Sequence, residues 1–128
     1  SLISRVYYEE MNHSLGDSYI TRIIKQAKVI MREDMSGDKS LESIADSLGI
    51  SYSLFRRDFK KRCGISPGQY RLELKLAKAK ELLYSTNMSI ADISSKLYFE
   101  NIGQFSTFFK KKTGISPLEF RKNSYKSV

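Results

Sequence analysis

The side chains best suited to chemistry in this sequence begin with four cations on one short stretch. Arg56 and Arg57 stand one helical turn before Lys60 and Lys61. An arginine can offer a two-pronged donor to the edge of a guanine. A lysine is better suited to pairing with a phosphate. This stretch therefore suggests contact with a polyanion.

A second stretch carries a related but less charged set. Lys110 and Lys111 follow the first lysine pair by fifty positions, and Asn101 and Gln104 precede them. Each amide could pair bidentately with an adenine. Asn101 and Gln104 also stand in capping-box relation, so a helix cap is an alternative use for Asn101.

A repeat identifies the elements that must hold these side chains. Residues 59–71 return as residues 109–121, with Phe, Lys, Lys, Gly, Ile, Ser, Pro and Arg in the same places. Gly64 and Gly114 are predicted to end a helix, because glycine takes the left-handed conformation without steric cost. The Ser-Pro pair after each glycine caps and begins the next helix. Each copy is therefore predicted to be helix, sharp turn, helix.

A short helix is predicted ahead of each copy. Ser40 caps one that closes at Gly49, and Ser51 caps the basic helix over residues 52–62. A short helix, a tight glycine turn and a basic second helix form a helix-turn-helix, whose second helix fits the DNA major groove. Ser89 caps the corresponding short helix of the second copy, where the turn holds one more residue.

Other periodicities complete the predicted fold. Apolar residues at helical spacing predict a first helix from Tyr19 to about Gly37, and a longer helix from Pro67 to about Tyr84 that is apolar on two sides. At about 1.5 Å per residue the longer helix is a rod of roughly 27 Å. The prediction is an all-α, seven-helix domain with two helix-turn-helix lobes joined by a long linker helix. Its predicted parts are a linker or tail (1–18), a domain (19–123) made of a first lobe with the connecting helix (19–86) and a second lobe (87–123), and a C-terminal tail (124–128).

Charge and composition narrow the function classes. The chain has a net charge of +8, with six basic against six acidic residues in 1–39, nine against five in 40–88 and seven against three in 89–128. A basic excess that follows the repeat predicts two matched contacts with nucleic acid. No apolar run approaches the roughly 20 residues of a membrane span. The lone Cys63 excludes an internal disulfide and fits a cytoplasmic location.

The sequence offers little for catalysis. The folded region has no histidine to act as a base, no recurring carboxylate pair and no glycine-rich phosphate loop, and nothing in it suggests a metal or another cofactor. We therefore expect a binding protein rather than an enzyme. The phenylalanines at i and i+4 in each basic helix, opposite the lysines, are expected to be core residues.

Four segments together resemble the DNA-binding domain of AraC-type (AraC/XylS family) bacterial transcription regulators. They are residues 44–51, 59–71, 76–83 and 105–111, within a match from about Tyr19 to Lys122. The resemblance implies sequence-specific binding to double-stranded DNA, with the two recognition helices in successive major grooves. It also implies an N-terminal sensor or receiver domain outside this sequence, and RNA polymerase as a possible partner.

Carried over by position, the resemblance implies a base-reading face in each lobe. Two positions depart from the family pattern, since Tyr98 stands at the usual turn glycine and Thr107 where an arginine often stands. Both departures predict weaker base readout by the second lobe. The implied base-reading residues are Tyr52, Ser53, Arg56, Arg57, Asn101, Ile102, Gly103, Gln104 and Thr107, and the expected phosphate partners are Ser40, Ser51, Lys60, Lys61, Ser89, Lys110 and Lys111.

Two other functions compete with specific DNA binding. A helical protein-interaction module could dock on polymerase or on the missing sensor domain. Non-specific binding to RNA or to single strands would require exposed aromatic residues on the basic faces, where only Tyr52 qualifies. Strong dependence of binding on salt would separate DNA binding from apolar docking.

Overall fold

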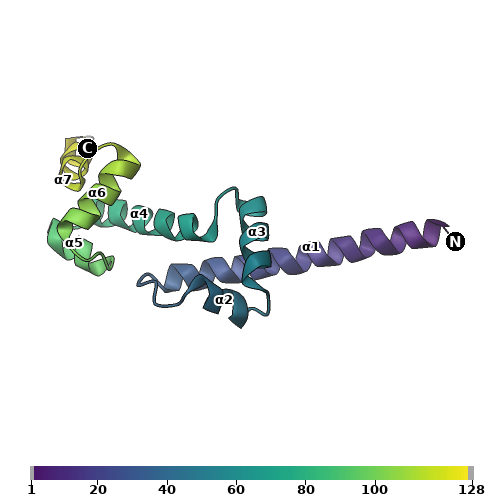
Figure 1. The fold of residues 1–128 in the computed structure, drawn as a ribbon. Coiled ribbons are helices and arrows are strands. Elements are labelled where there is room, and N and C mark those ends of the chain that lie inside the picture. The colour runs from purple at the N-terminus through teal and green to yellow at the C-terminus, as the bar shows by residue number, and fades with distance from the viewer. Residues whose placement is uncertain (1, 127–128) are drawn as a thin grey trace. The chain divides into compact units, whose positions relative to one another are not determined.

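The structure is a computed structural model that describes the backbone of residues 2–126 and the side chains of residues 16–125. Within these residues it contains seven helices and no strand, so the predicted all-α class is confirmed (Figure 1). The helices are α1 (Leu2–Glu33), α2 (Leu41–Ser47), α3 (Tyr52–Cys63), α4 (Pro67–Ser85), α5 (Ile90–Lys96), α6 (Ile102–Thr113) and α7 (Pro117–Lys126).

The chain folds as two compact units that divide between Gly68 and Gln69. The first unit contains α1, α2 and α3, and the second contains α5, α6, α7 and nearly all of α4. The sequence predicts that the connecting helix belongs to the first lobe (19–86). In the structure, α4 contributes its buried residues to the core of the second unit.

The core of the first unit joins α1, α2 and α3. Phe55 and Phe59 of α3 are fully buried, with ring centroids 5.7 Å apart in an edge-to-face arrangement. This burial confirms that the phenylalanine pair belongs to the core. The other buried apolar residues of this unit are Ile23, Ile24, Ala27, Met31, Ile44 and Ala45.

The core of the second unit repeats this plan and adds α4 and α7. Phe105 and Phe109 of α6 are fully buried, with ring centroids 5.9 Å apart. Phe120 of α7 packs edge-to-face on Phe109 at 5.3 Å. The remaining buried residues of this cluster are Leu76, Ala79, Leu82, Leu83, Ile93 and Leu97.

Both ends of the chain are more helical than predicted. α1 begins at Leu2, whereas the periodicity predicted a start at Tyr19 after a tail or linker of residues 1–18. α7 continues to Lys126, into the segment 124–128 that was predicted to be a C-terminal tail. An apolar period locates the buried stretch of a helix and does not fix the residue at which the helix begins or ends.

The prediction that α4 is apolar on two sides is only half right. One predicted apolar side consists of Leu72, Leu76, Ala79 and Leu83, and all of these except Leu72 are buried in the second unit. The other side includes Tyr84, which is 58% exposed.

The two helix-turn-helix turns begin with the same left-handed residue and the same backbone hydrogen bond. In the first, Gly49 has φ +74°, and the Ile50 amide donates to the Ala45 carbonyl at 3.1 Å. In the second, Tyr98 has φ +64°, and the Phe99 amide donates to the Ser94 carbonyl at 3.0 Å. Tyr98 therefore carries a left-handed strain that glycine avoids.

Tyr98→Gly is expected to raise the free energy of unfolding of the second unit by about 0.5–1 kcal/mol, because relief of the strained φ outweighs the added freedom of glycine in the unfolded chain. Tyr98 is 60% exposed, so little packing is lost. Urea denaturation followed by helical circular dichroism measures the change. As a matched control, Gly49→Ala should destabilise the first unit, since an added Cβ there has free space and meets only the backbone strain. A destabilised Tyr98→Gly variant would contradict the strain argument.

A buried serine ties the longer second turn to the start of α6. Ser94 is 2% exposed and stands where the first lobe has Ala45. Its hydroxyl donates to the Asn101 carbonyl at 3.0 Å, which ties α5 to the residue that caps α6. Ser94 is therefore a polar replacement that this longer turn requires.

Ser94→Ala should destabilise the second unit by about 1 kcal/mol, because it removes one buried hydrogen bond and leaves a small void. Thermal or urea unfolding measures the loss. Ser95→Ala provides the control, since Ser95 is exposed on the same helix and its loss should cost less than about 0.5 kcal/mol. Equal stabilities of the two variants would show that the bond contributes nothing net.

Candidate nucleic-acid interface

Helix α3 is fixed at both of its ends. The Ser51 hydroxyl accepts from the Leu54 amide at 3.3 Å at the start, and Gly64 ends the helix with φ +82° and an amide that donates to the Lys60 carbonyl. The buried Phe55 and Phe59 hold one face against the core. The residues of the opposite face are therefore directed outward.

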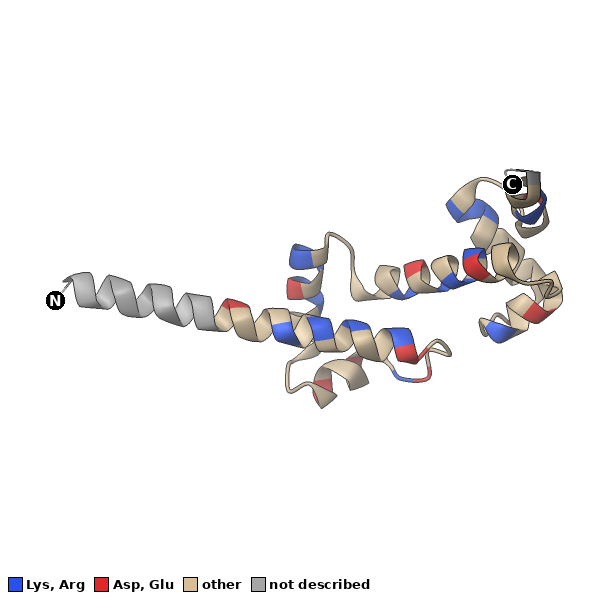
Figure 2. Ribbon diagram, turned by 180° about the vertical axis from the view of Figure 1, so that it is seen from behind, with Lys and Arg blue, Asp and Glu red and all other residues tan. Residues whose placement is uncertain are grey.

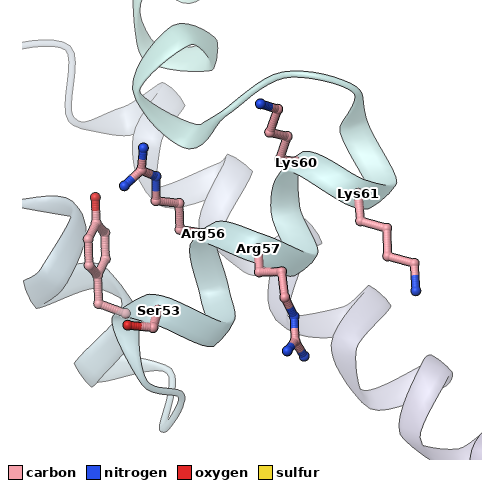
Figure 3. A pocket seen from close by; sticks show the side chains of 6 residues that line it. Ser53, Arg56, Arg57, Lys60 and Lys61 are labelled. Carbon is pink, nitrogen blue, oxygen red and sulfur yellow. The ribbon is translucent and has the colours of Figure 1, made fainter.

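The outward face of α3 gathers all the first-lobe residues predicted to read bases or to bind phosphate, apart from the two capping serines. Arg56, Arg57, Lys60 and Lys61 are exposed. Figure 3 shows Arg56 and Lys60 directed to one side of the helix, and Arg57 and Lys61 to the other. A hollow of about 540 Å³ lies on this face, and its lining residues are Tyr52, Ser53, Arg56, Arg57, Lys60 and Lys61.

The two arginines of this face differ in their surroundings. The Nε of Arg57 lies 3.6 Å from the carboxylate of Asp58. Among the described residues, no ion pair or hydrogen bond engages Arg56. An ion pair at an exposed site is worth at most about 1 kcal/mol, so Arg57 remains able to change partner. Arg56, unlike Arg57, can bind a base without first giving up a carboxylate partner.

Arg62 of α3, by contrast, is held by α1. Its guanidinium donates to the Asp17 carboxylate at 2.7 Å and to the Thr21 hydroxyl at 2.9 Å. Asp17 belongs to the segment predicted to be a tail, so this contact was not predicted. A hollow of about 570 Å³ lies beside it, lined by residues of α1 and α3. The pairing joins α1 to the last turn of α3.

The second lobe uses the side-chain amides of Asn101 and Gln104 to cap α6. The Asn101 Oδ1 accepts from the backbone N–H of Gln104 at 2.8 Å, which confirms the capping alternative. The Gln104 Oε1 accepts from the backbone N–H of Glu100, also at 2.8 Å. A bidentate pair with adenine needs the side-chain oxygen as well as the nitrogen, so each amide would have to leave its cap. Their predicted role as adenine readers therefore has weak support.

The rest of the predicted second-lobe set lies on the surface of α6. Ile102, Gly103 and Thr107 are exposed, as are Lys110 and Lys111. Helix α6 ends at Gly114 with φ +87°, as α3 does at Gly64, and basic residues occupy the last turn of both helices. Figure 2 shows the basic residues of the described part of the chain in blue.

Serine caps begin both short helices. The Ser40 hydroxyl accepts from the Ser43 amide and the Ser89 hydroxyl from the Asp92 amide, each at 3.0 Å. These bonds confirm both predicted caps. Each leaves other amides of its first turn directed outward, where a phosphate could bind. Their role as phosphate partners stays a prediction.

Lys75, a cation outside the predicted site, lies beside the turn between α5 and α6. Lys75 of α4 places its ammonium 5.0 Å from the centroid of the Phe99 ring. Burial first, and then the charge of Arg71, lowers the pKa of Lys75. The periodicity of α4 does not predict this contact, because Phe99 lies outside α4, in the longer turn between α5 and α6.

The described part of the chain shows neither a metal site nor a membrane span. No group of three or more potential metal-ligating side chains comes together among these residues. None of their helices is both long and apolar enough to cross a bilayer.

Known proteins share both the sequence and the fold. A family profile described as a helix-turn-helix domain matches residues 44–123. The transcriptional activator RhaS of Enterobacter sp. (strain 638) is 31% identical over 98 residues, which make up 77% of this chain and 35% of that protein. The arabinose operon regulatory protein of Escherichia coli K12 is 32% identical over 113 residues, 88% of this chain and 39% of that protein. This chain therefore spans little more than a third of the length of either relative.

A solved structure shows the same family. A transcriptional regulator from Chromobacterium violaceum, described as containing an AraC-type DNA-binding domain, superposes with a TM-score of 0.75. It is 30% identical, and the match covers 81% of this chain and 93% of that one. Together with the two helix-turn-helix lobes, these similarities show that the chain belongs to the AraC-type family of helix-turn-helix DNA-binding domains of transcription regulators.

Proposed function

We propose that this chain binds specific sites in double-stranded DNA, with α3 and α6 each entering a major groove and the two grooves lying one helical turn apart. The observation that carries the proposal is the outward face of α3. Two arginines and two lysines are exposed there, while two phenylalanines of the same helix are fully buried on the opposite side.

The residues of this face divide into two roles. Arg56 and Arg57 lie nearer the start of α3, with Tyr52 and Ser53 in its first turn, and the start of a recognition helix is the part that reaches base edges. Lys60 and Lys61 lie in the last turn and are positioned for phosphates. Lys110 and Lys111 have the corresponding place in α6. The capped starts of α2, α3 and α5 supply further donors.

The remainder of the assignment follows from the family. The chain acts by binding rather than by catalysis, in the bacterial cytoplasm where its DNA lies. The proposal includes a further sensor or receiver domain that controls the chain, and the chain's span of only 35% and 39% of the lengths of the two relatives supports it. RNA polymerase is the protein partner that an activator of transcription would contact.

Footprinting on a site selected from a random DNA pool tests this proposal. Protection should extend over about two helical turns, and affinity should fall steeply between low and moderate salt as counterions are released. A footprint of one turn would contradict binding by both lobes. Binding that hardly responds to salt would favour an apolar protein-docking module instead.

A further inference from the structure

The outward faces of α3 and α6 have opposite chemical characters. Both helices are twelve residues long and bury a phenylalanine pair in the same register, so the outward positions correspond at a spacing of fifty. At the four positions of α3 that precede the lysines stand Tyr52, Ser53, Arg56 and Arg57. At those of α6 stand Ile102, Gly103, Ser106 and Thr107.

None of these four α6 residues carries a charge or an amide. The neighbouring amides of Asn101 and Gln104 are engaged in the cap through their side-chain oxygens, each at 2.8 Å. Gly103 protects that cap, because a Cβ at this position would lie 3.2 Å from the Asn101 Oδ1. Beside the side-chain NH2 groups of Asn101 and Gln104, the start of α6 therefore presents hydroxyls, bare backbone and aliphatic carbon.

The aliphatic carbon is concentrated at Ile102 and at the methyl group of Thr107. Ile102 is 46% exposed in the first turn of α6, and Thr107 is exposed in the next turn. A single exposed isoleucine is ordinary on a protein surface. This one occupies the position of the DNA-facing Tyr52, and Lys110 and Lys111 follow on the same helix. The position of Ile102 on the helix, rather than its exposure, suggests that DNA covers this side chain.

In the major groove, the feature that aliphatic carbon recognises is the C5-methyl group of thymine. We propose that the second lobe reads thymine methyl groups through Ile102 and Thr107, while the first lobe reads guanine through its arginines. This inference rests on the proposed DNA binding. It predicts a bound site with a guanine-containing half for α3 and a thymine-containing half for α6.

Deoxyuridine tests the inference, because it differs from thymidine only by the missing methyl group. With the 128-residue chain and its selected site, each contacted thymine of the second half-site that is replaced by deoxyuridine should weaken binding about fourfold. Ile102→Ala should bind the thymidine site more weakly than the wild type, and its response to deoxyuridine should fall to less than twofold at the base that Ile102 contacts. The same replacement in the first half-site should change affinity less than twofold.

Two comparisons make the result specific. Leu118→Ala removes an aliphatic side chain that is 51% exposed on α7 of the same unit, and it should leave the response to deoxyuridine unchanged. 7-Deazaguanine should weaken binding only when it is placed in the first half-site. Equal affinity of the wild-type chain for thymidine and deoxyuridine in the second half-site, with guanine readout intact, would overturn this inference alone. Loss of all preference over random DNA would overturn the proposed function as well.

Discussion

Arg121→Met is expected to lower the free energy of unfolding of the second unit by about 3 kcal/mol. The Arg121 guanidinium donates to four backbone carbonyls at the end of α4 and just beyond it. The distances are 3.0 Å to Leu83, 2.6 Å to Met88, 3.4 Å to Leu82 and 3.3 Å to Thr86. The last carbonyls of a helix generally lack backbone partners within it, and the helix dipole favours a cation there. The Leu82 carbonyl also accepts from the Thr86 amide at 3.2 Å and from the Thr86 hydroxyl at 2.6 Å.

Methionine fills a similar volume but leaves these carbonyls without their charged donor, so the loss exceeds that of an ordinary surface substitution. Chemical denaturation followed by circular dichroism measures it. Arg121→Lys should recover less than half of the loss, because a single ammonium cannot reproduce the planar fork. Lys122→Met is the control, since Lys122 is the exposed neighbour on the same helix. Equal unfolding free energies for the two methionine variants would contradict the role of Arg121.

Arg56→Ala is expected to weaken binding to the selected DNA site by about 1–3 kcal/mol and to relax the preference at one base pair. Lys60→Ala should instead weaken binding to every sequence alike and reduce the salt slope by about one unit, because one phosphate contact is lost. Arg56 and Lys60 lie one turn apart on the same exposed side of α3 (Figure 3). They therefore form a matched pair that differs in its partner on the DNA.

Fluorescence anisotropy on the selected site and on random DNA, at several salt concentrations, measures both effects. Arg57→Ala should cost less than Arg56→Ala, because Arg57 must first exchange the Asp58 carboxylate at 3.6 Å. Equal losses on selected and random DNA for both Arg56→Ala and Lys60→Ala would reject this division into base and phosphate contacts.

Local signals were strong enough to predict most of the fold. The Ser40, Ser51 and Ser89 caps, and the left-handed glycines at Gly64 and Gly114, appear in the structure as expected. Each such signal acts through neighbouring backbone groups, so a few residues suffice to reveal it. For the same reason the register of α3, and with it the outward face of the candidate site, could be predicted.

Contacts between distant segments could not be predicted in this way. Arg62 pairs with Asp17 across 45 positions, and Arg121 reaches Leu83 across 38. Ser94 stands where the first lobe has Ala45, and its bond to the Asn101 carbonyl is not visible in any local pattern. Asn101 and Gln104 fitted both capping and base reading, and local spacing alone did not decide between them. These outcomes depend on tertiary geometry.

The place of Arg121 in the chain order has a consequence for synthesis on the ribosome. The carbonyls it binds, from Leu82 to Met88, are synthesised more than thirty residues ahead of it. Among the described residues, the buried apolar side chains that pack α1, α2 and α3 together end, by contrast, at Phe59. Nascent chains should thus complete the core of the amino-terminal lobe first, while the carboxy-terminal lobe locks only once Arg121 has left the exit tunnel.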